Sequence, residues 1–382
     1  MDSRRVTPKE VPSPCFVIET AKIRHNLAVL KRVKKATGIR ILFAQKSFAT
    51  YAVYPVMANV LDGVCASGLW EAKLGYEEFD GEVHTYCPAY RPDEIDDIFK
   101  MSHTVVFNSV SQLNQFREVI ARHRPKTEIG IRINPECSVT ETELYDPCSP
   151  GSRLGIRLQD IDTVDWSLVD GIHFHALCEQ TSHALEKVLH SVEDRFSDAL
   201  SKVRWLNMGG GHFITQEDYD IEHFVRLVTA FKGRHPHLRL YIEPGGAVVL
   251  NAGILVASVL DVLPGSPPNA ILDISCTCHT PDVLEMPYRP KVQSEIPIAD
   301  APHVYELGGV SCLAGDRFGR YGFETPLTVG DRVVFLDMAQ YSIVKTTMFN
   351  GVRHPAVAVY DADTNDLEMI RTFSYNDFKN RL

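Results

Sequence analysis

The chain has 382 residues, of which 45% are hydrophobic and 23% are charged. It carries 39 lysines and arginines against 49 aspartates and glutamates, a formal net charge of -10. This length and composition predict a globular protein of about two domains. The acidic balance, without any offsetting basic run, argues against a nucleic-acid-binding protein.

The sequence also lacks the patterns of a membrane or secreted protein. Nowhere do about 18 uncharged apolar residues follow one another, and residues 1–10 contain no apolar signal core. We therefore expect no membrane association and a cytoplasmic location. The 9 cysteines are an odd number in a chain too long to need disulfide staples, so we expect reduced thiols.

The first strong pattern in chain order is the apolar run from Arg40 to Lys46, which is typical of a buried strand. Seven further strand-like runs follow, and the segments between them carry apolar residues at helical spacing. These runs are residues 63–67, 83–87, 104–108, 128–134, 171–176, 205–209 and 238–245. Eight such units in about 220 residues favour a closed, TIM-like (β/α)8 barrel over an open doubly wound sheet.

Beyond residue 250 the pattern changes to apolar and β-branched runs without long helices between them. These runs are residues 254–262, 270–274, 303–307, 332–336 and 356–360. They predict a second, mostly β C-terminal domain. Because the N-terminal run 15–18 needs strand partners, we assign residues 25–250 to the barrel, and residues 1–24 plus 251–382 to a β-sandwich or β-barrel domain.

In a parallel barrel, functional side chains project from the carboxyl ends of the strands. Lys46 ends the first run, and burial there would lower its pKa toward the free amine that acts as a nucleophile. A lysine that simply extends from the strand end into solvent is the alternative. Glu243 ends the eighth run, which is adjacent to the first in a closed barrel.

Two further strand ends carry groups suited to binding a cofactor. His173 and His175 share one face of the sixth run, and we expect His173 to be a hydrogen-bonded core residue and His175 to reach the barrel mouth. Gly209, Gly210 and Gly211 lie between a strand and a helix, where consecutive N–H groups can bind an anion. A tight strand–helix turn is the alternative for the glycines.

A strand-end lysine, an anion-binding turn, a carboxylate and a flat imidazole together fit pyridoxal 5'-phosphate. The aldehyde, phosphate, ring nitrogen and ring face of this cofactor each need one of these groups. The sequence resembles the alanine-racemase-like, fold-type III decarboxylases, which depend on this cofactor and include enzymes acting on diaminopimelate and ornithine. Most of the chain is covered, and the similar segments are residues 44–48, 65–71, 173–176, 207–211, 243–245, 311–316 and 337–341.

The resemblance implies a role for each of several residues. Lys46 would link to the cofactor, His175 would stack on its ring, and Glu243 would pair with its ring nitrogen. Cys312 would protonate the carbon that loses carbon dioxide, and would reach the site from the second subunit of a homodimer with shared active sites. The residues implied to hold or support the cofactor are Gly209, Gly210, Gly211, Tyr341 and Arg132, with Glu71 nearby.

Within this family, residues 282–290 and 312–316 are most similar to the carboxynorspermidine decarboxylases. That similarity implies decarboxylation of carboxynorspermidine and carboxyspermidine in polyamine biosynthesis. Two departures from the other branches point the same way, because Gly246 replaces an arginine found in many relatives and Leu313 replaces an acidic residue.

A carboxy-polyamine substrate needs carboxylates to offset the desolvation of its ammonium groups. The candidate substrate residues are Glu243, His279, Asp282, Glu285 and Asp316. For the three last, a solvated loop charge or an acceptor for backbone amides is the alternative. Arg289 either contacts a carboxylate or neutralises Glu285.

The sequence leaves two other functions open and disfavours a metal site. A decarboxylase of another basic amino acid, such as meso-diaminopimelate, and a non-catalytic regulatory relative stay open, although the presence of both Lys46 and Cys312 favours an enzyme. A metal site at Cys276-Thr277-Cys278-His279 is disfavoured, because we expect a strand there and no second ligand pair follows at zinc spacing. We therefore expect no metal.

Overall fold

The structure is a computed structural model that describes residues 10–140 and 142–382. The chain divides into two compact units. One contains His25–Lys46 and Tyr54–Val248, and the other contains the described residues up to Arg24, Ser47–Val53 and Val249–Leu382. No helix in the described ranges is long and apolar enough to cross a membrane.

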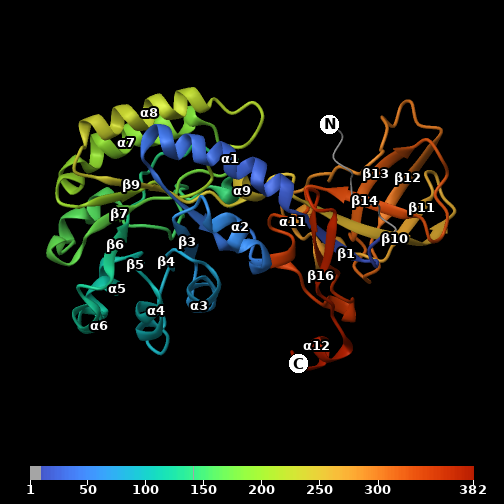
Figure 1. Cartoon of the computed structure of the whole chain (residues 1–382), viewed down its shortest axis with the longest axis horizontal. Helices are drawn as coiled ribbons and strands as arrows, with labels where there is room; N and C mark the ends of the chain where they lie inside the picture. Colours follow the sequence, from blue (N-terminus) through green and yellow to red (C-terminus); the bar gives the residue numbers. More distant parts are fainter. Residues whose placement is uncertain (1–9, 141) are drawn as a thin grey trace. The chain divides into compact units, whose positions relative to one another are not determined.

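The first unit is a closed barrel of eight parallel strands, as the sequence predicted (Figure 1). The barrel closes where Arg40 and Ile41 pair in parallel with Tyr241 and Ile242. The strands are β2 (Arg40–Ala44), β3 (Gly63–Ala66), β4 (Glu82–Tyr86), β5 (Thr104–Phe107), β6 (Glu128–Arg132), β7 (Gly171–His173), β8 (Trp205–Asn207) and β9 (Arg239–Ile242).

The barrel interior is filled by side chains, with Trp205 as its largest fully buried residue. Trp205 packs with Leu42, Val106 and Tyr241. A Cβ atom at Gly171 would lie 1.9 Å from the Trp205 ring, so β7 can pass this ring only as glycine.

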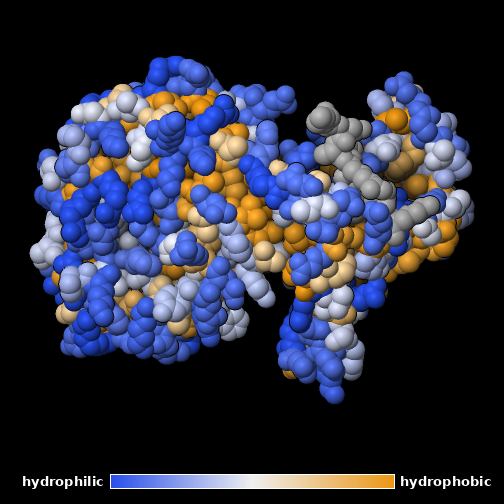
Figure 2. All heavy atoms as spheres, in the orientation of Figure 1, coloured by the Kyte–Doolittle hydropathy of each residue, from blue (hydrophilic) through white to orange (hydrophobic). Residues whose placement is uncertain are grey.

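Helices surround the barrel, and hydrophilic residues cover most of the barrel surface visible in Figure 2. The long helices α7 and α8 bury apolar residues at helical spacing, such as Leu185 and Leu189 on α7 and Phe224 and Phe231 on α8. The helices are α1 (Thr20–Thr37), α2 (Tyr54–Ala58), α3 (Leu69–Glu78), α4 (Ile95–Met101), α5 (Val110–Gln115), α6 (Arg117–His123), α7 (Ser182–Ser201), α8 (Ile221–Arg234) and α9 (Gly246–Val249).

The second unit is built on a mostly antiparallel sheet in the order β13-β12-β11-β10-β1-β15-β16, with β14 paired to β10. The N-terminal strand β1 (Cys15–Glu19) pairs with β10 and β15 of this sheet. The other strands are β10 (Gly253–Leu263), β11 (Asn269–Leu272), β12 (His303–Gly308), β13 (Arg317–Phe323), β14 (Arg332–Leu336), β15 (Ala356–Asp361) and β16 (Asp366–Arg371).

Three short helices complete this unit, α10 (Cys276–His279), α11 (Asp282–Glu285) and α12 (Tyr375–Lys379). The prediction of a strand at residues 276–279 is wrong. Ser275 caps a helix there, because its hydroxyl accepts the Cys278 N–H at 3.2 Å. The two thiols therefore do not share a strand face.

Candidate active site

Lys46 lies in a 3₁₀ turn, Gln45–Ser47, directly after β2. The turn is anchored by the buried Gln45 side chain, which donates to the Glu71 carbonyl at 2.8 Å and accepts from the Tyr54 hydroxyl at 3.0 Å. The Lys46 side chain is exposed. This exposure contradicts the burial expected for Lys46 and agrees with the alternative of a strand-end lysine that extends into solvent.

Glu243 follows β9 and is buried. Its carboxylate accepts from Asn207 Nδ2 at 2.7 Å and lies 3.3 Å from His173 Nε2. Burial raises the pKa of Glu243, but its interactions with His173 and Asn207 outweigh this and hold the pKa below its usual value. Burial lowers the pKa of His173, so the imidazole is neutral and hydrogen-bonded, as expected for a core histidine.

His175 lies beyond the end of β7 rather than on the strand with His173. Its Nδ1 accepts the Gly210 N–H at 3.0 Å, which places the ring proton on Nε2. Burial, followed by the charge of Lys46, lowers the pKa of His175 well below its usual value. The ring is therefore a neutral group beside Lys46.

The glycine turn after β8 is tightly packed. A Cβ atom at Gly210 would lie 2.5 Å from the Glu243 carbonyl oxygen, and one at Gly211 would lie 2.1 Å from the Leu177 carbonyl oxygen. The expectation that all three N–H groups are open to an anion is not met, because Gly209 donates to Asn207 Oδ1 at 2.9 Å and Gly210 donates to His175. Of the three, only the Gly211 N–H lacks a hydrogen bond to another described residue.

Arg132 ends β6 and its side chain is buried beside these groups. Nη2 donates to the His175 carbonyl at 3.1 Å, and the guanidinium carbon lies 4.6 Å from the centre of the Tyr86 ring. Burial lowers the pKa of Arg132, and its Nε has no hydrogen-bond partner within the described ranges. An unsatisfied N–H on a buried cation fits an anionic ligand.

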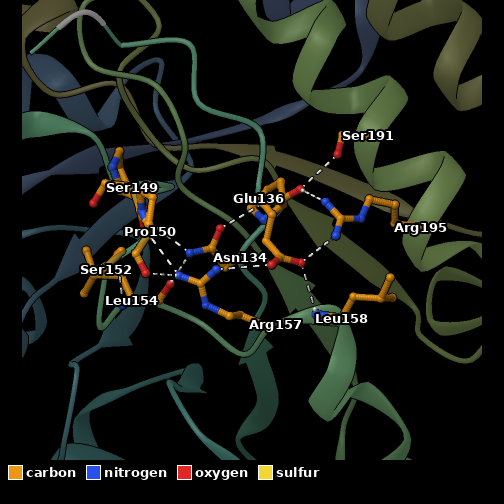
Figure 3. Close-up of polar contacts among 12 residues, drawn as sticks. Asn134, Glu136, Ser149, Pro150, Ser152, Leu154, Arg157, Leu158, Ser191 and Arg195 are labelled. Carbon is orange, nitrogen blue, oxygen red and sulfur yellow. Dashed lines mark hydrogen bonds and ion pairs between the residues drawn. The ribbon is translucent and has the colours of Figure 1, made fainter. Parts of the chain in front are cut away.

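The segment after β6 is held by a polar network around Glu136 (Figure 3). Its carboxylate pairs with Arg157 at 3.1 Å and with Arg195 of α7 at 2.7 Å. Glu136 itself has a left-handed backbone, with φ of 51°. Asn134 contributes by donating to the carbonyls of Pro147 and Leu154. This network fixes the chain that leaves Arg132.

Sequence reasoning missed two neighbours of Glu243. Asn207 lies in the similar segment 207–211 but was assigned no role, although it ends β8, the strand next to β9 in the barrel. Cys65, on β3, is the second neighbour of Glu243. Burial, followed by the charge of Glu243, raises the pKa of its thiol well above the usual value. The strand-end rule that selected Glu243 would also have selected Asn207.

In the sheet unit, Cys312 lies in the exposed connection between β12 and β13. Its N–H donates to Asn350 Oδ1 at 2.7 Å. The start of this connection is organised by buried Asp316, which accepts from the Ser311 N–H at 3.1 Å, the Ser311 hydroxyl at 2.5 Å and the Cys276 N–H at 2.6 Å. These bonds favour the alternative reading of Asp316, an acceptor for backbone amides.

The other predicted substrate residues have different surroundings. Asp282 and Glu285 on α11 both pair with the Lys345 ammonium. His279 is fully buried, so it does not line an accessible surface of the chain. The suggested pairing of Arg289 with Glu285 is wrong, because Arg289 pairs with Glu295 at 2.6 Å.

Tyr341 follows the short segment after β14 and has a left-handed backbone, with φ of 50°. Its N–H donates to the Ser47 carbonyl at 2.7 Å, within the same unit of the structure. Ser47 is the residue after Lys46 in the sequence. The hydrogen bond therefore fixes Tyr341 to the residue that follows the strand-end lysine.

Comparison with known proteins gives a clear family match. Residues 15–339 match the family described as pyridoxal-dependent decarboxylase, C-terminal sheet domain. The sequence is 44% identical to carboxyaminopropylagmatine decarboxylase of Synechocystis sp., over 97% of this chain and 96% of that protein. It is 40% identical to carboxynorspermidine/carboxyspermidine decarboxylase of Campylobacter jejuni, over 98% of this chain and 99% of that protein.

The fold comparison agrees. The crystal structure of carboxynorspermidine decarboxylase from Campylobacter jejuni, complexed with norspermidine, matches with a TM-score of 0.89 and 39% identity. The match covers 97% of this chain and 100% of that one. Diaminopimelate decarboxylase from Helicobacter pylori matches with a TM-score of 0.83 at 16% identity, which shows a shared fold alone.

Proposed function

The chain belongs to the pyridoxal-dependent decarboxylases, and on this premise we propose that it removes carbon dioxide from a carboxylated polyamine, with carboxynorspermidine and carboxyspermidine as its substrates. The family predicted from the sequence is confirmed. The observation that supports this substrate class is a sequence similarity. The chain is 34% to 44% identical, over nearly its whole length, to decarboxylases named for such substrates.

The barrel residues suit the cofactor of this family. Pyridoxal 5'-phosphate, when bound, accepts the electrons left on the substrate carbon as carbon dioxide departs. The exposed amine of Lys46 would bind the cofactor covalently, and the ionised carboxylate of Glu243 would hold a proton at its ring nitrogen. The neutral imidazole of His175 would contact the ring. The unsatisfied Arg132 Nε and the Gly211 N–H could bind the phosphate, and the family resemblance implies that Gly209, Gly210 and Tyr341 also support it.

We further infer that Cys312 supplies the proton to the carbon that has lost carbon dioxide. Support comes from its exposed position in a connection that Asp316 and Asn350 hold in place. The family resemblance implies that this thiol reaches the active site of the second subunit, so we infer a homodimer. All nine cysteines are free thiols, which supports a cytoplasmic location for that dimer.

The substrate ammonium groups need carboxylate partners. Asp282 and Glu285 already hold one ammonium group, that of Lys345, and this shows the chemistry that the pair offers. We propose that they contribute to binding the polyamine chain. Asp316 and His279 act by supporting the neighbouring backbone, since both are buried.

A second candidate substrate is carboxyaminopropylagmatine. It is favoured by the 44% identity to the Synechocystis enzyme of that name. Agmatine ends in a guanidinium group, which binds carboxylates through two parallel hydrogen bonds, whereas the other substrates end in an ammonium group. The two substrate types therefore differ in the terminal group that the protein must recognise.

The test is carbon dioxide release from a panel of substrates. We expect carboxynorspermidine and carboxyspermidine to give kcat/KM values about 10² to 10³ times that of meso-diaminopimelate, because diaminopimelate has fewer ammonium groups to pair with carboxylates such as Asp282 and Glu285. Carboxyaminopropylagmatine as the best substrate would select the second candidate. Diaminopimelate as the best substrate, or no release from any compound, would overturn the proposal. Lys46→Ala should abolish release, whereas the exposed Lys73→Ala should not.

A further inference from the structure

His183, Glu186 and His223 form a cluster that the decarboxylation chemistry does not use. His183 and Glu186 lie three residues apart on the first turns of α7, and His223 lies in the first turn of α8. Figure 1 shows α7 and α8 side by side on the outside of the barrel. Each of the three residues offers one ligand atom, and these atoms all lie within 4.8 Å of one another.

The chemical composition of this cluster is that of a transition-metal site. Two imidazoles and one carboxylate are the ligands that bind zinc in sites where water completes the coordination. A tetrahedral zinc ion with bonds of about 2.0 to 2.1 Å separates its ligand atoms by roughly 3.3 Å. His223 Nε2 and Glu186 Oε2 are already 3.5 Å apart.

A second observation concerns the orientation of His223. Its Nδ1 lies 2.9 Å from the hydroxyl of Ser182, which is fully buried. When Nδ1–H donates to this hydroxyl, the lone pair of Nε2 points out of the ring toward Glu186. Metal-binding histidines nearly always have such a partner on the other ring nitrogen, because it fixes both the tautomer and the ring orientation.

The remaining ligand, His183, requires a small rearrangement. Its ring stacks on that of His223, with centroids 4.0 Å apart and an angle of 27° between the planes. Two stacked imidazoles do not direct their lone pairs at one point, so the His183 ring must turn to bind. His183 is exposed, so the stack on His223 is the contact that this rotation gives up.

The helix ends oppose metal binding at this site. The positive ends of the α7 and α8 dipoles disfavour a cation. The Glu186 carboxylate offsets this effect. We propose that His183, Glu186 and His223 bind one divalent transition-metal ion, such as zinc. This ion would link the start of α7 to the start of α8.

The proposal is tested by titrating metal-free holoenzyme with zinc in competition with a chromophoric chelator. We expect one zinc ion per chain at this site. His183→Ala and His223→Ala should each weaken that binding by about 10-fold or more, since loss of even an outer partner of a ligand costs that much. Glu186→Gln should weaken it while keeping the side-chain shape. His190→Ala, an exposed histidine further along α7, should bind zinc as the unchanged protein does.

A thermal measurement supplies an independent readout. Zinc that binds only the folded chain raises Tm by mass action. We expect this rise in the unchanged protein and in His190→Ala, but not in the double variant His183→Ala/His223→Ala. Equal zinc affinity and an equal Tm rise in the double variant would overturn the proposal. Failure of the unchanged protein to take up stoichiometric zinc would also overturn it.

Discussion

At the scale of single residues, Asn207 connects two parts of the candidate active site. Its Nδ2 donates to Glu243 at 2.7 Å, and its Oδ1 accepts the Gly209 N–H at 2.9 Å. One side chain therefore positions both the carboxylate and the glycine turn. Because Asn207 is fully buried, no water can replace either hydrogen bond without a rearrangement.

We predict that Asn207→Asp lowers kcat by about 10²-fold, the scale of a lost electrostatic contact. A second buried carboxylate beside Glu243 makes the pair share a proton, which removes the full negative charge proposed to hold the cofactor nitrogen. The kcat–pH profile should shift, because the pair then titrates in the assay range. In the double variant with Glu243→Gln, the losses should not add. An unshifted profile with additive losses would mean that Asn207 only supports the fold.

At the scale of elements, the connection after β6 depends on the Glu136 carboxylate and on the unusual backbone of Glu136. We predict that Glu136→Ala lowers the free energy of unfolding by about 2 kcal/mol, because Arg157 and Arg195 both lose their partner at a partly exposed site. Glu136→Gly loses the same contacts but relieves the left-handed φ of 51°, so it should be about 1 kcal/mol milder.

Urea unfolding of the two variants separates these effects. Glu143→Ala is the control, because this glutamate is exposed in the same connection and should change stability by less than about 0.5 kcal/mol. If the glycine variant proved less stable than the alanine variant, the backbone at Glu136 would not be strained.

The sequence predicted the barrel because its strands are continuous apolar runs between helical patterns, and it predicted Glu243 and His175 because strand ends face one side of a barrel. It failed where local pattern is weak. Residues 276–279 are apolar enough for a strand, but the Ser275 cap makes them helical. Strands β13 and β16 were not predicted, since glycines interrupt one and charged residues alternate in the other. Partners such as Glu136 and Arg195, 59 residues apart, leave no local signal.

At the scale of the whole molecule, each unit contains a buried histidine that resists protonation. Burial lowers the pKa of His212 in the barrel to about 4. In the sheet unit, burial and then the charge of His354 lower the pKa of His279 to about 3. A histidine in the unfolded chain has a pKa of about 6.5. Between that pH and the lower pKa of the buried histidine, the unfolded chain binds protons that the folded chain does not. The contribution of these histidines to the free energy of unfolding is therefore fully present above about pH 6.5 and falls as the pH decreases.

We predict that acidification from pH 7 to 4 removes roughly 3 kcal/mol per buried histidine from the free energy of unfolding. Urea unfolding at several pH values measures the slope. His212→Phe should reduce the slope, whereas the exposed His190→Ala should leave it unchanged. A free energy of unfolding that stays constant from pH 7 to 4.5 would contradict the neutral state of these two side chains.

The proposed dimer with shared active sites can be tested by mixing two inactive variants. Cys312 and the three residues after it are exposed in the single chain, which suits a segment that reaches another subunit. Lys46→Ala and Cys312→Ala dimers should each be nearly inactive. If each site takes its lysine from one subunit and its cysteine from the other, mixed dimers contain one site with both residues intact. Since half of the dimers are mixed at equal proportions, activity should recover to about a quarter of the unchanged enzyme.

The matched control mixes Lys46→Ala with the double variant Lys46→Ala/Cys312→Ala. No dimer in that mixture contains an intact lysine, so subunit exchange alone should restore nothing. Exchange itself is followed by fluorescence transfer between differently labelled subunits. Demonstrated exchange without recovery in the first mixture would place Lys46 and Cys312 in the site of one chain, and the shared-site dimer would then be rejected.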